Sequence, residues 1–306
     1  STPCGTLFPY TTLFRSVAQD CIDYREHLRW TAALDTPGLA RAITVVGDRA
    51  YIADDWQGLR IVDITDPDHP QPLGVAETPG NVRDVAVAGD LAYVTVHDVG
   101  LHVIDVSDPT QPLTIGSVAT PPAIESLALA GSHVLVTGSP HQYWIESFVA
   151  VIDVADPQLP EVVLTIDSLP LRLACDVAVA GDRAFVACSG FGLAILDIAN
   201  PAQPHLVAEF DPGHHALRVT VAGPLAYVSL RDFVGTGHWV EIIDISDPLQ
   251  AATVGRVPLP DLAEEVAVAG GRAYVANDER GLRVLDVGDP TQPTTLGTLD
   301  RSEEHT

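Results

Sequence analysis

Lysine and methionine are absent from this chain, and cysteine and aromatic residues are scarce. The lack of lysine excludes a phosphate-loop lysine, a Schiff-base lysine and a serine–lysine nucleophile pair. Four cysteines in 306 residues are too few for a scaffold built on disulfides. No apolar run approaches the ~18 residues that a membrane-spanning helix needs. A net charge of −25 argues against nucleic acid as a partner, because a phosphate backbone requires a basic surface.

The two ends of the chain differ from the rest of the sequence. TLFPYTTLFRS near the start and RSEEHT at the end resemble translated sequencing adapters, because one short DNA string read in opposite directions encodes LFRS and RSEE. Segments of this kind are set aside before the fold is considered. We therefore expect residues 1–16 and 301–306 to be non-native tails, Cys4 included, and the natural termini and any targeting signal to lie outside the sequence.

The body of the chain is repetitive. A Val-Ala-Gly-Asp type of turn recurs about every 42 residues, and Asp-Pro or Asn-Pro recurs at the same basic spacing, so that both markers count six units. In the second unit, four runs rich in Val, Ile, Ala and Tyr lie between Gly-Asp and Asp-Pro turns, over residues 82–88, 91–96, 101–106 and 113–119. A period of this length with four strands per unit predicts a β-propeller.

The third run of each unit is similar to a known repeat. LRIVDITDP, LHVIDVSDP, VAVIDVADP, LAILDIANP, VEIIDISDP and LRVLDVGDP resemble the LVIVD repeat of bacterial and archaeal surface or secreted propeller-like proteins. The resemblance covers residues 39–300. It implies an architecture and an extracellular or cell-surface location rather than a particular reaction.

The expected fold is all-β, a propeller of four-stranded antiparallel blades with six full blades plus part of one more. Residues 17–38 are expected to supply the remnant outer strand of a preceding blade, since LRWTAALDTPG matches the end of a unit. Either the ring has seven or more blades and is truncated here, or residues 294–299 leave the ring and the N-terminal strand closes it. The six blades are placed at residues 39–80, 81–122, 123–172, 173–214, 215–261 and 262–300.

Repeated acids and two cysteines have structural interpretations. One acid occupies the same position in every unit and is expected to accept backbone N–H bonds. Calcium is a weaker alternative, because no EF-hand-like spacing is present; no other cofactor and no metal site is expected. Counting from the Gly181-Asp182 turn places Cys175 opposite Cys188, which allows a disulfide, although two buried thiols explain the pair almost equally well. The repeated acids are Asp63, Asp105, Asp153, Asp197, Asp244 and Asp286.

Candidate ligand-binding residues gather in loops that should share one face of the ring. Repeat proteins place recognition in such loops, and exposed aromatic side chains suit sugars or extended peptides; the other interpretation is that these rings pack against one another. The candidates are Trp56, His141, Tyr143, Trp144, His214, His215, Phe233, His238 and Trp239. Alignment of the inner strands predicts a second polar set at the channel mouth, comprising Asp84, Asp176, Arg218 and Glu265.

Two classes of function follow from this sequence. The favoured one is a non-enzymatic extracellular or cell-surface module that binds or scaffolds a glycan, peptide or protein through one loop face. The alternative is a propeller-type hydrolase or lyase with a polar site at the channel mouth. The chain has no GxSxG or HExxH motif and no zinc-ligand spacing. Propellers host both binding and catalysis, so the fold alone does not choose.

Overall fold

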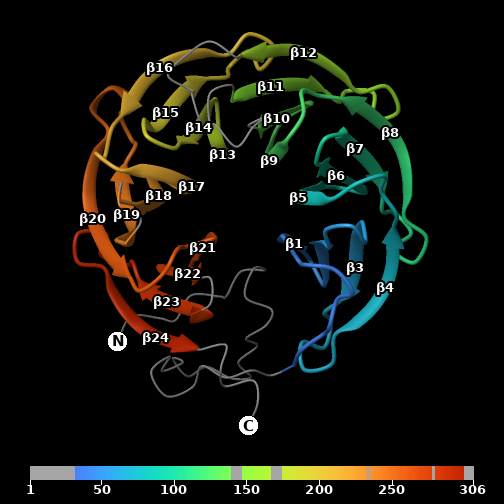
Figure 1. Ribbon diagram of the computed structural model, residues 1–306, viewed down its shortest axis with the longest axis horizontal. Helices are drawn as coiled ribbons and strands as arrows, with labels where there is room; N and C mark the ends of the chain where they lie inside the picture. Colours follow the sequence, from blue (N-terminus) through green and yellow to red (C-terminus); the bar gives the residue numbers. More distant parts are fainter. Residues whose placement is uncertain are drawn as a thin grey trace.

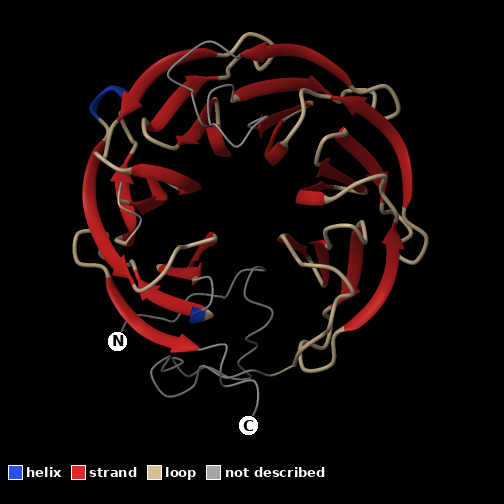
Figure 2. Cartoon of the chain, viewed as in Figure 1, coloured by secondary structure: helices blue, strands red, loops and turns tan. Residues whose placement is uncertain are grey.

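The protein is a β-propeller of six blades. The structure is a computed structural model that describes residues 32–138, 147–166, 174–232, 234, 236–277 and 280–299. Within these ranges the strands form six four-stranded antiparallel sheets, arranged around a central channel (Figure 1). Figure 2 shows that strands and loops make up nearly all of the described chain. The predicted all-β fold with four-stranded blades is confirmed.

Each blade is one contiguous stretch of chain, and its first strand lies nearest the channel (Figure 1). The strands of blades 1 to 3 are β1 (Ala42–Val46), β2 (Arg49–Ala53), β3 (Leu59–Asp63), β4 (Gln71–Ala76), β5 (Val82–Ala88), β6 (Leu91–Val96), β7 (Gly100–Asp105), β8 (Leu113–Ala119), β9 (Ile124–Ala130), β10 (His133–Gly138), β11 (Phe148–Asp153) and β12 (Glu161–Ile166). Those of blades 4 to 6 are β13 (Ala174–Ala180), β14 (Arg183–Cys188), β15 (Gly192–Asp197), β16 (His205–Phe210), β17 (His215–Ala222), β18 (Leu225–Arg231), β19 (His238–Asp244), β20 (Ala252–Leu259), β21 (Glu265–Ala269), β22 (Arg272–Ala276), β23 (Leu282–Asp286) and β24 (Thr294–Leu299).

The core lies between blades. The second and third strands are apolar on both faces, because each face packs against a neighbouring blade. In β6, Val94 belongs to the buried cluster shared with blade 1, whereas its neighbour Tyr93 belongs to the cluster shared with blade 3. Five such clusters join consecutive blades from blade 1 to blade 6. Burial of each Val, Leu or Ile in these layers contributes about 1.5–3 kcal/mol.

Two repeated glycines explain how the blades are shaped. The glycine of each first hairpin turn has a φ between 56° and 62°, which favours glycine because it has no Cβ. A second glycine recurs in the outer strand, where a Cβ on Gly116 would collide with the carbonyl oxygen of Pro157. Gly74 and Pro109 of the preceding pair of blades are related in the same way. The Asp-Pro turn of one blade therefore docks against the outer strand of the blade before it.

The expected part of a further blade is not supported. Residues 32–38 contain no strand, and residues 17–31 lie outside the described part of the chain. Leu34 instead packs against a small buried cluster on blade 1. Residues 294–299 do not leave the ring either, because they form β24 and pair with β23. Each of the six sheets is thus complete without an N-terminal strand. In the described ranges, no helix has the length and apolar content to cross a membrane.

Candidate functional site

The two ends of the propeller differ, and the described candidate ligand-binding and channel-mouth residues belong to one of them. The loops between second and third strands share one end with the connections between blades, and we call this end the loop face. The first hairpin turns and the Asp-Pro turns share the opposite end, the turn face. Asp55, Asp98 and Ala123 have φ values of 49° to 60° and all lie on the loop face. Left-handed backbone at residues other than glycine costs of order 1 kcal/mol or more, so strain is concentrated at this face.

The inner strands of blades 2 to 5 each contain a β-bulge at the channel mouth. In blade 2, Val82 pairs with Val96 and Asp84 pairs with Thr95, so that Arg83 is an extra residue. A bulge bends the strand and re-aims the neighbouring side chains. Here it marks the change from the apolar part of each inner strand to the polar channel mouth. The extra residues of blades 3, 4 and 5 are Glu125, Cys175 and Leu217.

Two of the predicted channel-mouth carboxyl groups connect adjacent blades. Asp84 Oδ2 accepts a hydrogen bond from the backbone N–H of Leu127 at 2.9 Å. In the same way, Asp176 Oδ2 accepts one from the backbone N–H of Val219 at 2.8 Å. The hydroxyl of Ser126 donates to the other Asp176 oxygen at 2.6 Å. These bonds join blade 2 to blade 3, and blade 4 to blades 3 and 5, so both carboxyl groups already have a structural role.

The channel mouth also gathers acidic side chains. Burial, and to a lesser degree the charge of Asp176, raises the pKa of Asp84 to about 6, although backbone N–H bonds favour its ionised form. Separation from bulk water, followed by the charges of Asp176 and Asp84, raises the pKa of Glu265 to about 8, while Arg218 acts in the opposite direction. Arg218 also donates from Nε to the Glu264 carbonyl oxygen at 3.0 Å. The structure thus brings the four predicted channel-mouth residues into electrostatic contact.

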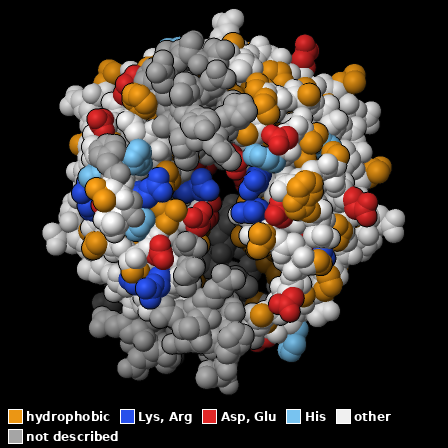
Figure 3. All heavy atoms as spheres, viewed as in Figure 1, with side chains coloured by type: hydrophobic (Ala, Val, Ile, Leu, Met, Phe, Trp, Pro, Cys, Tyr) orange, Lys and Arg blue, Asp and Glu red, His pale blue; other side chains and the backbone are white. Residues whose placement is uncertain are grey.

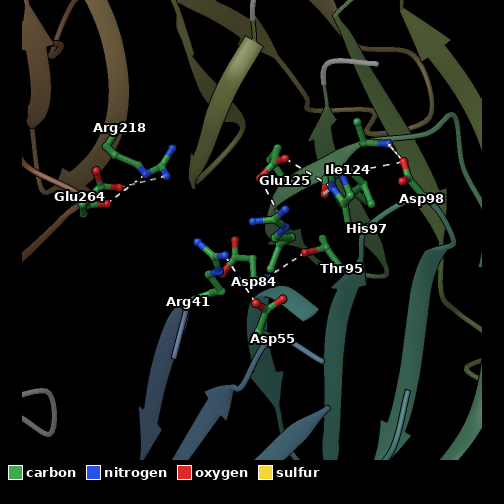
Figure 4. A network of polar contacts seen from close by, with 12 residues as sticks. Arg41, Asp55, Asp84, Thr95, His97, Asp98, Ile124, Glu125, Arg218 and Glu264 are labelled. Atoms are coloured by element: carbon green, nitrogen blue, oxygen red, sulfur yellow. Dashed lines mark hydrogen bonds and ion pairs between the residues drawn. The ribbon is translucent and has the colours of Figure 1, made fainter. Parts of the chain in front are cut away.

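A set of partly exposed ion pairs surrounds the mouth (Figure 4). Arg83 Nε lies 4.0 Å from a Glu125 carboxylate oxygen, and the other Glu125 oxygen lies 3.4 Å from His97 Nδ1. On the other side of the channel, Arg218 lies 3.8 Å from the Glu264 carboxylate (Figure 4). Exposed pairs of this kind contribute about 0–1 kcal/mol each. Among the described residues, no group of three His, Cys, Asp or Glu side chains could hold a metal ion.

The predicted aromatic residues that the structure describes differ in their exposure. Trp56 is 69% exposed, whereas Trp239 is only 8% exposed. His214 meets Trp239 edge-on with ring centroids 4.4 Å apart, and the guanidinium carbon of Arg256 lies 4.9 Å from the Trp239 ring centroid. Trp239 is therefore packed by its neighbours rather than offered to a ligand. The other predicted residues of this group, His141, Tyr143, Trp144 and Phe233, lie outside the described residues.

His215 forms a hydrogen bond with a serine that is not presented for catalysis. Ser189 Oγ and His215 Nδ1 lie 2.9 Å apart, but Ser189 is only 3% exposed. Burial, followed by the charges of Arg231 and His214, lowers the pKa of His215. The pair packs the loop of blade 4 against blade 5. It does not supply the accessible nucleophile that a hydrolase needs.

The sequence did not reveal one cluster at the loop-face end of blade 5. His215 of β17 lies opposite Arg231 of β18, which in turn lies opposite His238 of β19. Figure 3 shows arginine and histidine side chains gathered over this blade, beside the central hollow. The sequence pointed to His215 and His238 as candidate ligand-binding residues, but it did not point to Arg231. The signal that could have identified it is the strand register of the fifth unit, which its expanded loop obscures.

The six repeated acids lie at the turn face and cap turns. Each accepts a hydrogen bond from the backbone N–H two residues later, at 2.8 to 3.0 Å. Hydrogen bonds from Ser107 lower the pKa of Asp105, and those from Ser246 lower the pKa of Asp244, because they stabilise the ionised carboxylates. A contact that recurs in every blade belongs to the fold rather than to one site. The acids are Asp63, Asp105, Asp153, Asp197, Asp244 and Asp286.

Of the two interpretations of Cys175 and Cys188, the structure has free thiols rather than the possible disulfide. Cys188 pairs with Ala174 instead, because Cys175 is the extra residue of the β-bulge. Counting residues outward from the turn had assumed an unbroken register. Burial raises the pKa of Cys175 to about 11 and raises the pKa of Cys188 further above its usual range. Both side chains are therefore thiols rather than thiolates at neutral pH.

Solved structures share this fold at low sequence identity. A functionally unknown protein from Desulfotomaculum acetoxidans superposes with a TM-score of 0.71 at 15% identity, covering 87% of this chain and 86% of that one. The WD40 β-propeller domain of Doa1 superposes with a TM-score of 0.65 at 11% identity, covering 87% of this chain and 85% of that one. The β-propeller domain of Cps50 (Swd1) from Myceliophthora thermophila superposes with a TM-score of 0.63 at 11% identity, covering 81% of this chain and 83% of that one. Likeness at these identities concerns the fold alone.

A family model accounts for more than half of the chain. The LVIVD repeat model matches blades 1, 2, 4 and 6, at residues 37–78, 79–120, 172–211 and 262–300. The two unmatched blades are those with expanded loops, and each has the same four strands in the same order. No curated protein matches the chain. The repeated motif and the propeller that it builds show that this protein belongs to the LVIVD-repeat family.

Proposed function

We propose that this propeller is a non-enzymatic module that binds a protein, peptide or glycan ligand through its loop face and thereby serves as a scaffold. The observation that carries the proposal is the contrast between its two ends. At the turn face, acids and Asp-Pro turns repeat from blade to blade, as a structural role requires. At the loop face, the repeat is broken by strained residues, expanded loops and a mixed-charge channel mouth, as recognition requires.

Exposed apolar side chains on opposite sides of the ring support a ligand of considerable size. Trp56 in blade 1 is 69% exposed and Phe191 in blade 4 is 43% exposed, and both lie in loops between second and third strands. Blades 1 and 4 lie across the channel from each other (Figure 1). A ligand that contacts both aromatic rings must therefore span the channel mouth. This reach suits a protein surface or an extended chain better than a small molecule.

The chemistry of the channel mouth supports binding rather than catalysis. Asp84 and Asp176 each accept a hydrogen bond from the adjacent blade, and Asp176 accepts a second bond from Ser126. Ser189, which lies beside His215, is buried. Catalysis would require a nucleophile or an acid–base pair that reaches a substrate, and these groups are already engaged.

We also propose an extracellular or cell-surface location for the protein. Support comes from the resemblance of its repeats to those of surface or secreted propeller-like proteins. A net charge of −25 without lysine suits a soluble module that stays dispersed outside the cell. Fractionation of cells that express the complete natural gene tests this location, and recovery only in the cytoplasm would contradict it.

Peptide and glycan arrays probed with the full chain test the proposed function. We expect the Trp56→Ala/Phe191→Ala double variant to lose most of the binding shown by the wild type. The matched control is Leu159→Ala/Leu249→Ala, because both leucines are exposed, at 76% and 74%, and lie on the turn face. Binding that falls only in the control would place recognition at the turn face and overturn the proposal.

A further inference from the structure

We propose that the loop-face end of blade 5 binds an acidic, partly apolar peptide segment of a partner protein, and that Arg231 holds a carboxylate of that segment. This inference rests on the proposed function. It assigns recognition to one blade and to one ligand chemistry.

Strand pairing gathers an arginine and two histidines at this end of blade 5. His215 stands opposite Arg231, and Arg231 stands opposite His238. Directly paired residues in antiparallel strands have Cα atoms about 4.5–5.5 Å apart, so the three side chains share a small area. The Arg231 guanidinium supplies a permanent positive charge at this place, in a protein whose overall charge is −25. A ligand carboxylate is complementary to that charge.

Within the described residues, the Arg231 side chain forms no hydrogen bond or ion pair, although its charge acts on the His215 ring. The carboxylate of the following residue, Asp232, is directed to its own loop, where it accepts hydrogen bonds from Thr236 and from the Gly237 N–H. By contrast, Arg256 of the same blade lies 2.6 Å from the buried carboxylate of Glu241. Arg231 thus keeps its five N–H donors for a ligand, and their planar arrangement matches a carboxylate.

One further nitrogen atom beside Arg231 is buried without a hydrogen-bond partner among the described residues. It is Nδ1 of His238, the residue that stands opposite Arg231. Buried polar atoms are normally hydrogen-bonded. A peptide group, which carries both a donor and an acceptor, can supply the partner that this ring nitrogen lacks.

Exposed apolar side chains occur in the loops next to Arg231 and to its neighbour His215. Val234, which is 83% exposed, lies three residues after Arg231. Phe191, which is 43% exposed, lies two residues after Ser189, whose hydroxyl is bonded to His215. The surface around Arg231 therefore combines a positive charge with exposed apolar side chains.

This composition favours a peptide over an acidic glycan. A sugar ring stacks on a flat aromatic face, but the Trp239 ring is covered by His214 and Arg256. Val234 is a branched aliphatic residue, which packs against apolar peptide side chains. An acidic segment with apolar neighbours complements both parts of the surface.

An array of peptides of about 12 residues, probed with the full chain, tests the inference. Each acidic, partly apolar peptide is paired with a version in which Asn and Gln replace Asp and Glu, and the strongest binder is titrated by fluorescence anisotropy. We expect Arg231→Gln to weaken binding about tenfold or more, and Arg231→Lys to weaken it less. Arg49→Gln is the matched control, because it makes the same change of charge at the turn face and should alter affinity less than about twofold.

The outcomes separate this inference from the proposed function. Peptide binding that depends on Trp56 and Phe191 but not on Arg231 overturns the inference and leaves loop-face binding intact. Equal losses in Arg231→Gln and Arg49→Gln also overturn it, since bulk charge would then explain the effect. Arg231-dependent binding of anionic glycans alone, on a parallel glycan array, overturns the peptide assignment. Binding of neither ligand class overturns both proposals. Thermal unfolding verifies that each variant folds. If Arg231→Gln does not fold, His238→Gln takes its place in the binding measurements.

Discussion

The Asp84 carboxylate in blade 2 accepts a hydrogen bond from the backbone N–H of Leu127 in blade 3, at 2.9 Å. Asp176 and Val219 repeat the arrangement between blades 4 and 5, at 2.8 Å. These contacts join inner strands that form no ladder with each other, since every sheet is confined to one blade. The acids at the channel mouth therefore stabilise the ring as well as lining it.

Removal of this contact should destabilise the ring. Asp84→Ala leaves the Leu127 N–H without its acceptor, and we expect the free energy of unfolding to fall by about 1–3 kcal/mol. Asp84→Asn should cost less, because the amide oxygen can still accept. Asp90→Ala in the exposed hairpin turn of the same blade is the control, with an expected change within about 0.5 kcal/mol. Urea unfolding measures all three, and an equal loss for Asp84→Ala and Asp90→Ala would contradict the inter-blade role.

Asp84 and Glu265 should each lower the stability of the fold as the pH rises from about 4 to about 8. The pKa values of Asp84 and Glu265 are raised in the folded protein, to about 6 and about 8. At these two groups the folded state binds more protons than the unfolded chain in this range, so their contribution to the free energy of unfolding falls with pH. Glu265→Gln should flatten the upper part of the slope, whereas Glu161→Gln in an outer strand should not. Urea unfolding at several pH values measures the slope, and an unchanged slope in Glu265→Gln would refute the assignment.

The two described tryptophans of the loop face should respond in opposite ways to truncation. Trp239 is packed between blades, and Trp239→Ala should lower the free energy of unfolding by about 3–5 kcal/mol. Trp56 is exposed, and Trp56→Ala should change stability by no more than about 0.5 kcal/mol. Denaturant unfolding compares them directly. Equal costs would show that the contrast in burial is wrong, and the result also decides which tryptophan can be used to probe binding.

The ion pair between Glu241 and Arg256 should contribute more to the free energy of unfolding than an exposed ion pair does. Glu241 is only 1% exposed, so Arg256→Ala leaves a buried carboxylate without its main partner, and we expect a loss of about 3 kcal/mol or more. Glu241→Gln introduced into this variant should recover part of the loss. Arg183→Ala removes a more exposed pair, with Asp197, and should cost about 1 kcal/mol at most. A double-mutant cycle with no coupling between Glu241 and Arg256 would contradict this prediction.

The blades could be predicted closely because their signals are local. The four strands expected in blade 2 match β5 to β8 to within one residue, with the only differences at the bounds of β7. Turn glycines, Asp-Pro pairs and apolar runs each act within a few residues, so they can be read directly from the sequence. The convergence of Asp84, Asp176, Arg218 and Glu265 was also accessible, because equivalent positions in repeats point to the same place.

Features that depend on register or on neighbouring blades could not be predicted. One extra residue in β13 moves Cys175 out of line with Cys188, and no local signal announces such a bulge. Burial of Trp239 depends on His214 from the blade connection and on Arg256 from the outer strand. The grouping of Arg231 with His215 and His238 likewise follows from the pairing of three strands. These contacts are set by the assembled ring rather than by any single unit.

Hydrogen exchange measured with and without the strongest array ligand tests the central claim, that recognition takes place at the loop face. The account predicts slowed exchange in the blade 5 segments around His215 and Arg231 and in the loop that carries Phe191. The turn-face hairpins at Gly47-Asp48 and Gly181-Asp182 should exchange at unchanged rates. Protection confined to those hairpins, with the loop face unaffected, would contradict the account.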